Sequence, residues 1–192
     1  MPVSQNINRK YNYKDYLTWP EGERWEIIDG VPYMQAAPSW QHQEILIELS
    51  RQFANYFQGK PCRVFVSPFD LCIAEYNEDD DNISNVMQPD IVVVCDENKL
   101  RKTGYFGVPA LVVEITSPST ARRDKLYKFN LYENAGVKEY WIVEPEQKLV
   151  SVFLLQENKR YGRPETYTDE NKILTSEFRD LEIDLRLVFT HL

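Results

Sequence analysis

Two short apolar stretches decide the fold of this chain: DIVVV at residues 90–94 and ALVVEI at residues 110–115. Both consist mainly of β-branched side chains and are apolar on both faces. Runs of this length and composition predict strands in the centre of a sheet that is covered on both sides. A third apolar run, EYWIV at residues 139–143, stops before Pro145 and predicts another strand of this kind.

Two helices are predicted around these strands. Ser39 can cap the first, which runs from about residue 40 to residue 57. Its apolar positions recur every fourth residue and so form one stripe that faces a core: Ile45, Leu49, Phe53 and Phe57. The second helix follows the strand breaker SPST, runs from about residue 121 to residue 135, and ends at Gly136.

The remaining elements are expected at the periphery. Asp29-Gly30 lies between two apolar runs and predicts a hairpin, because glycine readily adopts the positive φ of a tight turn. Apolar residues partly alternate over residues 62–73, which predicts one strand there. The period-two pattern of residues 149–155 and 181–189 predicts further strands or a hairpin, with a turn at residues 159–169.

Length and element order together define the expected architecture. The chain has 192 residues, about one ordinary domain, so we expect a single domain over residues 1–192. The elements predict an α/β (α+β) fold, in which a central mixed sheet is flanked by helices and carries an extra N-terminal hairpin.

The charge of the chain limits the classes of function. It has 22 Lys and Arg against 30 Asp and Glu, a formal net charge of -8. Such a balance argues against a non-specific polyanion binder, whose affinity comes from neutralising phosphates. A nucleic-acid enzyme therefore needs a bound metal or a local cluster of basic groups. The acidic loop at residues 75–85 supplies much of the negative excess. Basic residues gather instead at Arg122, Arg123, Lys125 and Lys128, which predicts a basic rim on the second helix.

Cysteine use and the N-terminal segment bear on the compartment. Cys62, Cys72 and Cys95 are scattered and odd in number, which argues against a disulfide scaffold and a cysteine zinc site and favours a reducing compartment. The polar lead lacks the apolar core of a signal peptide, and no apolar run approaches the length of a membrane helix. We therefore expect a cytoplasmic protein.

Two acidic residues stand at the ends of the central strands. Asp90 opens one strand and Glu114 closes the next, and a carboxylate beside apolar runs is costly unless it is paired, protonated or bound to a cation. Considered one at a time, each acid has a simple structural explanation. Asp90 would cap a turn, and Glu114 would pair with a nearby Lys or Arg. Taken together with the lysine-bearing helix, they favour one cavity in which both carboxylates hold a hard divalent ion.

The second helix offers a lysine to this cavity. Asp124, Lys128 and Tyr132 recur four residues apart and share one helix face. Two interpretations stay open for that face. It is a solvated surface with an ordinary Asp–Lys pair, or it turns Lys128 towards the cavity beneath Glu114, where an ammonium can orient a water molecule.

At this point the chain resembles a known family, the Uma restriction endonucleases, which are abundant in cyanobacteria and have a PD-(D/E)XK nuclease-like fold. The resemblance covers residues 13–155 and is carried by five motifs: WEIIDG at 25–30 with the helix-start His42, QPDIVVV at 88–94, VVEITSPST at 112–120, Asp124 with Lys128 and Tyr132, and GVKEYWIV at 136–143.

The resemblance implies metal-dependent hydrolysis of DNA phosphodiester bonds. Asp90 and Glu114 would match the two acidic positions that hold Mg²⁺ or Mn²⁺, with the carbonyl of Ile115 as a further ligand. The general motif has its lysine two residues after the second acid, where this chain has Thr116. A lysine of the following helix would replace it, best matched by Lys128, although Lys125 stays open.

Two further candidates, Glu26 and His42, each allow two interpretations. Glu26 adds a possible carboxylate from the hairpin, but alternation makes a solvent-facing position as plausible. His42 is a candidate proton carrier or DNA contact, against a purely structural role at the helix start. The expected protein is a Mg²⁺-dependent endonuclease, working as a homodimer because duplex cleavage needs two cuts. The alternatives are a catalytically inactive nuclease-fold binding module and a metal-dependent hydrolase of smaller substrates.

Overall fold

The computed structural model describes residues 9–74 and 78–192. The polar lead at residues 1–8 and the first part of the predicted acidic loop, residues 75–77, lie outside this range. The remainder of that loop, residues 78–85, consists of turns and irregular coil. Within the described ranges, no helix combines the length and the apolar character needed to cross a membrane.

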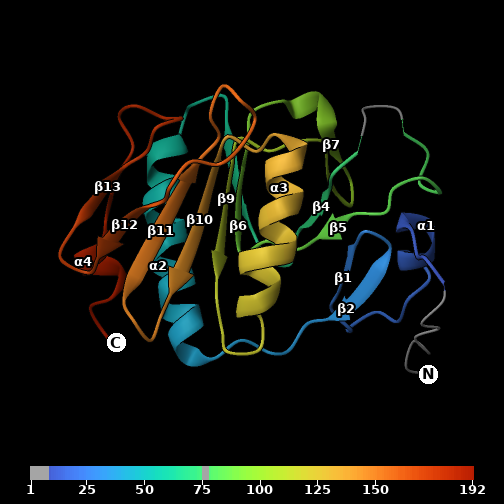
Figure 1. Ribbon diagram of the computed structural model, residues 1–192, viewed down its shortest axis with the longest axis horizontal. Helices are drawn as coiled ribbons and strands as arrows, with labels where there is room; N and C mark the ends of the chain where they lie inside the picture. The colour runs from blue at the N-terminus through green and yellow to red at the C-terminus, as the bar shows by residue number, and fades with distance from the viewer. Residues whose placement is uncertain (1–8, 75–77) are drawn as a thin grey trace.

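The central sheet has six strands in the order β12-β11-β10-β9-β6-β3 (Figure 1). Their bounds are β3 Arg63–Val66, β6 Ile91–Val94, β9 Leu111–Ile115, β10 Glu139–Glu144, β11 Leu149–Leu154 and β12 Glu165–Thr168. β9 and β10 are parallel, whereas the other neighbours are antiparallel. This confirms the predicted mixed sheet, and the three apolar runs are its buried inner strands β6, β9 and β10.

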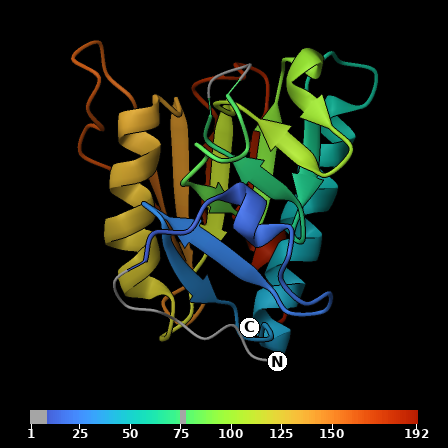
Figure 2. The same cartoon turned by 90° about the vertical axis from the view of Figure 1, so that its right-hand side faces the viewer.

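Helices cover the two faces of this sheet, as Figure 2 shows edge-on. α2 (Trp40–Phe57) packs on one face, with Ser39 as its cap, as predicted. The other face is covered by the π-helical segment η2 (Arg123–Lys128) and its continuation α3 (Phe129–Ala135). Because side chains alternate along a strand, the central strands supply apolar groups to both helical layers. A parallel β9–β10 pair requires such a helical crossover.

A second sheet, in the order β2-β1-β5-β4-β8-β7, lies beside the first. Its strands are β1 Trp25–Ile28, β2 Val31–Met34, β4 Asp70–Cys72, β5 Val86–Met87, β7 Leu100–Arg101 and β8 Gly104–Phe106. The helical turns α1 (Tyr13–Tyr16) and η1 (Glu97–Lys99) accompany it. The predicted hairpin is confirmed: β1 pairs with β2, and Asp29 and Gly30 both have positive φ, 50° and 75°.

Three peripheral predictions need correction. Residues 62–73 are two strands, β3 and β4, which belong to different sheets and are separated by the cis Ser67–Pro68 peptide. The expected turn at residues 159–169 contains strand β12. The predicted strand at residues 181–189 is wrong beyond Asp184.

The reason for the last error is a helix cap. β13 (Lys172–Leu174) pairs with β14 (Glu182–Asp184), and the chain then turns into α4 (Leu185–Val188). The Asp184 side chain accepts the backbone N–H of Arg186 and starts this short helix. A side-chain cap therefore overrides an alternating pattern that favours a strand.

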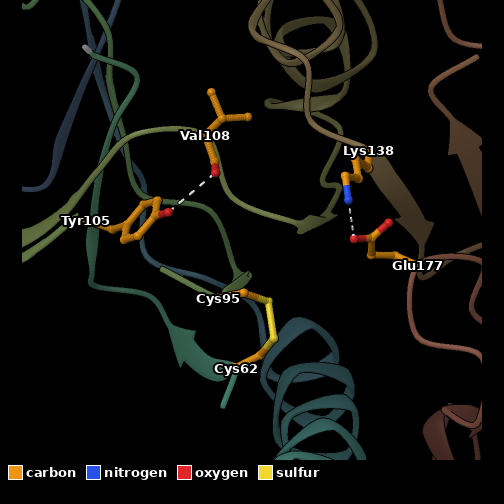
Figure 3. Close-up of a disulfide and its surroundings, with 6 residues drawn as sticks. All are labelled: Cys62, Cys95, Tyr105, Val108, Lys138 and Glu177. Carbon is orange, nitrogen blue, oxygen red and sulfur yellow. Dashed lines mark hydrogen bonds and ion pairs between the residues drawn. A yellow bond between two sulfur atoms is a disulfide. The ribbon is translucent and has the colours of Figure 1, made fainter. Parts of the chain in front are cut away.

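A single disulfide joins Cys62 and Cys95 (Figure 3). In the β3–β6 ladder Arg63 lies opposite Val94, so the same register places Cys62 opposite Cys95. The two cysteines are 33 residues apart in sequence, and only strand pairing brings them together. The cysteine spacing argued against a disulfide scaffold, and it gave no sign of this one bond. Cys72 is free and buried.

Candidate active site

Strand pairing brings the two predicted acids to one place. β6 and β9 are antiparallel, with Ile91 opposite Val113, so the continued register sets Asp90 opposite Glu114 on the same face. Both residues line a single cavity of about 710 Å³. Asp90 Oδ2 also accepts the backbone N–H of Ile115 at 2.7 Å, which fixes its carboxylate against β9.

The Lys128 ammonium lies among three carboxylates. Its Nζ is 2.8 Å from Glu26 Oε1, 2.9 Å from Glu114 Oε1 and 3.6 Å from Asp124 Oδ1. All four side chains are buried. Of the two interpretations of this helix face, the structure therefore has the one in which Lys128 turns towards Glu114. Lys125, by contrast, is 45% exposed and pairs with Glu144.

Glu26 arrives from the second sheet. It lies on β1, all of whose residues are buried, so the expected solvent-facing alternative is wrong: both faces of this strand are covered. Its Oε1 accepts the backbone N–H of Gln88 at 3.0 Å, and its Oε2 accepts from the Gln35 side chain. The Arg123 guanidinium lies 3.6 Å from Oε2.

His42 faces Asp90 from the first turn of α2. Its Nε2 lies 3.1 Å from Asp90 Oδ1. The helix cap is the Ser39 side chain, which accepts the backbone N–H of His42 at 3.2 Å, so the imidazole itself is not needed for capping. His42 Nδ1 is buried and has no hydrogen-bond partner among the described residues. Both residues line the cavity.

The buried cluster holds three carboxyl groups around the one ammonium of Lys128. Burial raises the pKa of Glu114 well above its usual value, opposed by Lys128 and reinforced by Asp124 and Asp90. Burial likewise raises the pKa of Asp124, again opposed by Lys128. Burial opposes the charged form of Lys128, but Glu114, Glu26 and Asp124 outweigh it and raise the pKa of Lys128 above the usual lysine range.

A second donor completes the surroundings of Glu114. The Tyr132 hydroxyl donates to Glu114 Oε1 at 3.0 Å, the same oxygen that Lys128 contacts. Burial raises the pKa of Tyr132 well above its usual value, so the phenol stays a donor at neutral pH. The backbone at Asp124 is also fixed, because the Tyr140 hydroxyl donates to the Asp124 carbonyl at 3.0 Å.

The donor set suits a hard divalent cation. Asp90 and Glu114 present carboxylate oxygens from opposite positions of two paired strands, and Mg²⁺ is typically held by one or two carboxylates and several water molecules. Across the described ranges, no group of three or more His, Cys, Asp or Glu side chains is already arranged as a metal cage. A cation here would rely on two carboxylates, and Ile115 also lines the cavity.

The predicted basic rim is not formed. Lys128 is buried among carboxylates, Lys125 pairs with Glu144 at 2.5 Å, and Arg123 is turned towards Glu26. Arg122 remains exposed, 5.9 Å from the centroid of the Tyr127 ring. Lys128, Lys125 and Arg123 are therefore paired with neighbouring carboxylates. A local basic field on this helix does not offset the negative charge of the chain.

Two partners of Glu26 were not among the candidates of the sequence analysis. Gln35 and Gln88 hold the Glu26 carboxylate, and no pattern marks an isolated glutamine as a partner of a distant glutamate. Thr116 stands where the general nuclease motif has its lysine. Its hydroxyl donates to the carbonyl of Val143 at 3.2 Å, which makes it a structural group of the β9–β10 edge.

Comparison with known proteins identifies the family. The profile of the Uma2 family, described as "Putative restriction endonuclease", matches residues 13–186. The chain belongs to this family. The Uma2 match extends to residue 186 and so includes most of the segment after residue 155, over which the sequence resemblance is weaker.

Two relatives and one solved structure are similar to this chain. The uncharacterized Synechocystis protein slr1290 is 34% identical over 137 residues, covering 70% of this chain and 68% of the relative. A second uncharacterized Synechocystis protein, sll1609, is 29% identical over 125 residues, covering 64% and 67%. A crystal structure from Anabaena variabilis, described as a putative nuclease belonging to DUF820, superposes with a TM-score of 0.73 at 17% identity, covering 93% and 97% of the two chains. This last likeness establishes the nuclease-like fold.

Proposed function

We propose that this Uma2 chain is a metal-dependent endonuclease that hydrolyses phosphodiester bonds of DNA. One observation carries the proposal: the Lys128 ammonium lies 2.9 Å from Glu114, and Glu114 lies opposite Asp90 in one cavity. Carboxylates of this kind can hold a metal ion that activates water for phosphoryl transfer, and a nearby ammonium can stabilise the charge that develops. The family description supports the reaction class.

Each residue then has a separate task. Asp90 and Glu114, with the carbonyl of Ile115, hold Mg²⁺ or Mn²⁺, which when bound polarises a phosphoryl oxygen and lowers the pKa of bound water. Lys128, which lines the same cavity, orients the attacking water. Glu26 keeps that ammonium charged and in place at 2.8 Å.

His42 positions the carboxylate of Asp90. Its Nε2 faces Asp90 Oδ1 at 3.1 Å, while the backbone N–H of Ile115 binds the other oxygen. The two contacts hold the carboxylate plane in one orientation, which positions its remaining lone pairs towards the cavity. His42 is also available there as a proton carrier.

The test uses isosteric variants. Asp90→Asn and Glu114→Gln should abolish Mg²⁺-dependent nicking of supercoiled plasmid and weaken Mn²⁺ binding in calorimetry. Glu182→Gln is the matched control, because Glu182 is a 53% exposed acid on β14 outside the cavity. If the wild-type protein cleaved no DNA substrate with either metal, the endonuclease proposal would be refuted.

The assembly is a separate part of the proposal. Cutting both strands of a duplex requires two active sites or two visits by one site, so we propose that the protein acts as a homodimer. Sedimentation equilibrium of the full chain measures this directly. A strictly monomeric protein would refute the homodimer, and cutting both strands would then need two visits by the one site.

A catalytically inactive binding module is the second candidate. It is favoured by the tight hold of three carboxylates on Lys128 and by the lack of a preformed metal cage among the described side chains. Absence of Mn²⁺ heat together with stable partner binding would support it. Turnover of nucleotides without turnover of polynucleotides would instead indicate a hydrolase of smaller substrates.

A further inference from the structure

An exposed tryptophan stands at the rim of the cavity. Trp40, the first residue of α2, is 61% exposed and lines the cavity that contains Asp90 and Glu114. Large aromatic side chains normally bury most of their surface, as Trp25 and Trp141 do here. The helix start does not require an indole, because Ser39 provides the cap. Trp40 is therefore available to a ligand of this cavity.

The position of Trp40 ties it to the catalytic candidates. It precedes by two residues His42, whose imidazole contacts Asp90. In Figure 1 the beginning of α2 lies at the same end of the sheet as the loop after β9. The wall next to Trp40 is made of the small residues Ala36, Ala37 and Pro38, which leave one side of the cavity smooth and apolar.

The same cavity also contains basic side chains. Arg24 lines it, and so does Lys148, whose ammonium already donates to the backbone carbonyl of Leu192. Arg24 donates to the side chains of Gln88 and Ser67, so its guanidinium is held by neutral partners and keeps its charge for an anion. An aromatic platform beside cations is the combination with which proteins bind single-stranded nucleic acid, the ring taking a base and the cations taking phosphates.

We propose that Trp40 stacks on an unpaired nucleobase of the DNA strand whose phosphate enters the cavity, so that the substrate is single-stranded or locally unpaired DNA. A base inside an intact duplex is already stacked on both faces and cannot offer a face to the indole. This inference rests on the proposed endonuclease function, because it takes the cavity as the phosphate site. A protein partner seated on Trp40 would instead cover the entrance to the cavity.

The test measures DNA binding without catalysis. A fluorescein-labelled single-stranded 20-nucleotide DNA and the same sequence as a duplex are titrated in EDTA at low salt with the wild-type full chain, Trp40→Ala and Ile47→Ala. Ile47 is the matched control, because it lies on the same helix, is 66% exposed and does not line the cavity.

Loss of one stacked base corresponds to roughly 5- to 150-fold weaker binding. We expect such a loss for Trp40→Ala with the single strand, less than a twofold change for Ile47→Ala, and weaker wild-type binding to the duplex. The intrinsic fluorescence of the wild type should fall on single-strand binding, and this change should be absent in Trp40→Ala.

Three results would overturn the inference: no single-strand binding by the wild type, equal single-strand affinity for Trp40→Ala and wild type, or duplex binding at least as tight as single-strand binding. A Trp40 fluorescence change that follows protein concentration alone would equally overturn it, in favour of self-association. The titration contains no metal, so the two proposals can fail separately. If the wild type cleaves neither single-stranded DNA nor supercoiled plasmid with Mg²⁺ or Mn²⁺ but still binds the single strand, the endonuclease proposal is removed and the stacking interaction stands.

Discussion

Replacing Lys128 by Met tests the charge balance of the buried cluster most directly. The substitution keeps the length and the apolar stem of the side chain but removes the ammonium that lies 2.8 Å from Glu26 and 2.9 Å from Glu114. The carboxylates that remain are buried, so water cannot replace the lost cation. We therefore expect a large loss in the free energy of unfolding at neutral pH.

The size of the effect follows from these distances. At an effective dielectric constant of about 20, each of the two short contacts contributes a gross attraction of about 6 kcal/mol. Desolvation of the ammonium, several kcal/mol, opposes this attraction. Removal of one partner from a buried ion pair costs about 3–5 kcal/mol in practice. For a chain of this size that corresponds to a fall in Tm of roughly 6–20 °C.

The pH dependence of the stability loss in Lys128→Met provides a second, independent test. Burial raises the pKa of Glu114 and of Asp124, and Lys128 opposes both shifts, so its removal raises these pKa values further. A carboxyl with a raised pKa in the folded state stabilises the protein when protonated and loses that contribution as the pH rises through the folded pKa. The deficit of Lys128→Met should therefore be largest near pH 8 and shrink on acidification towards pH 5.

Urea unfolding followed by circular dichroism between pH 5 and pH 8 measures both effects. Lys125→Met is the control, since Lys125 forms an exposed pair with Glu144 on the same helical segment, and we expect a change of about 0–1 kcal/mol. Adding Glu114→Gln to Lys128→Met should restore part of the loss. A Lys128→Met protein as stable as the Lys125→Met control at pH 8, or a deficit that grows on acidification, would refute the reasoning.

Three further changes have defined outcomes. Tyr132→Phe removes a buried donor to Glu114 and should cost about 1–3 kcal/mol in urea unfolding, with a loss below about 0.5 kcal/mol contradicting the hydrogen bond. Replacing both Cys62 and Cys95 by Ala opens a 33-residue link and should cost about 3–4 kcal/mol; unchanged stability under non-reducing conditions would mean that the bond does not form. Ser39→Ala removes the cap of α2 and should lower stability by about 1 kcal/mol, measurable by thermal circular dichroism.

Local patterns were sufficient wherever burial is encoded by short-range periodicity. The helix at residues 40–57 has its observed bounds because its stripe of apolar residues repeats with the helical period and Ser39 precedes it. The inner strands β6, β9 and β10 follow from runs that are apolar on both faces. The hairpin at Asp29-Gly30 follows from the turn residues themselves.

Patterns failed where a cap or a partner elsewhere in the chain decides the conformation. The alternating residues after Asp184 fit a strand, yet the side chain of Asp184 starts a helix there. The apolar stretch at residues 62–73 fits one strand, yet its halves pair with different neighbours and enter two sheets. Neither outcome is visible in the period of the sequence: at Asp184 a local side-chain cap overrides the alternation, and for residues 62–73 the deciding strand partners lie outside the segment.

The site divides in the same way. From the sequence alone came the two strand-end acids, Asp90 and Glu114, and the helix face that bears Lys128, because costly charges beside apolar runs are conspicuous. Only the tertiary structure brought Glu26 from a second sheet to that ammonium and Trp40 to the rim of the same cavity. Periodicity reports which side chains leave water, whereas the packing of separate sheets and helices determines which of them meet.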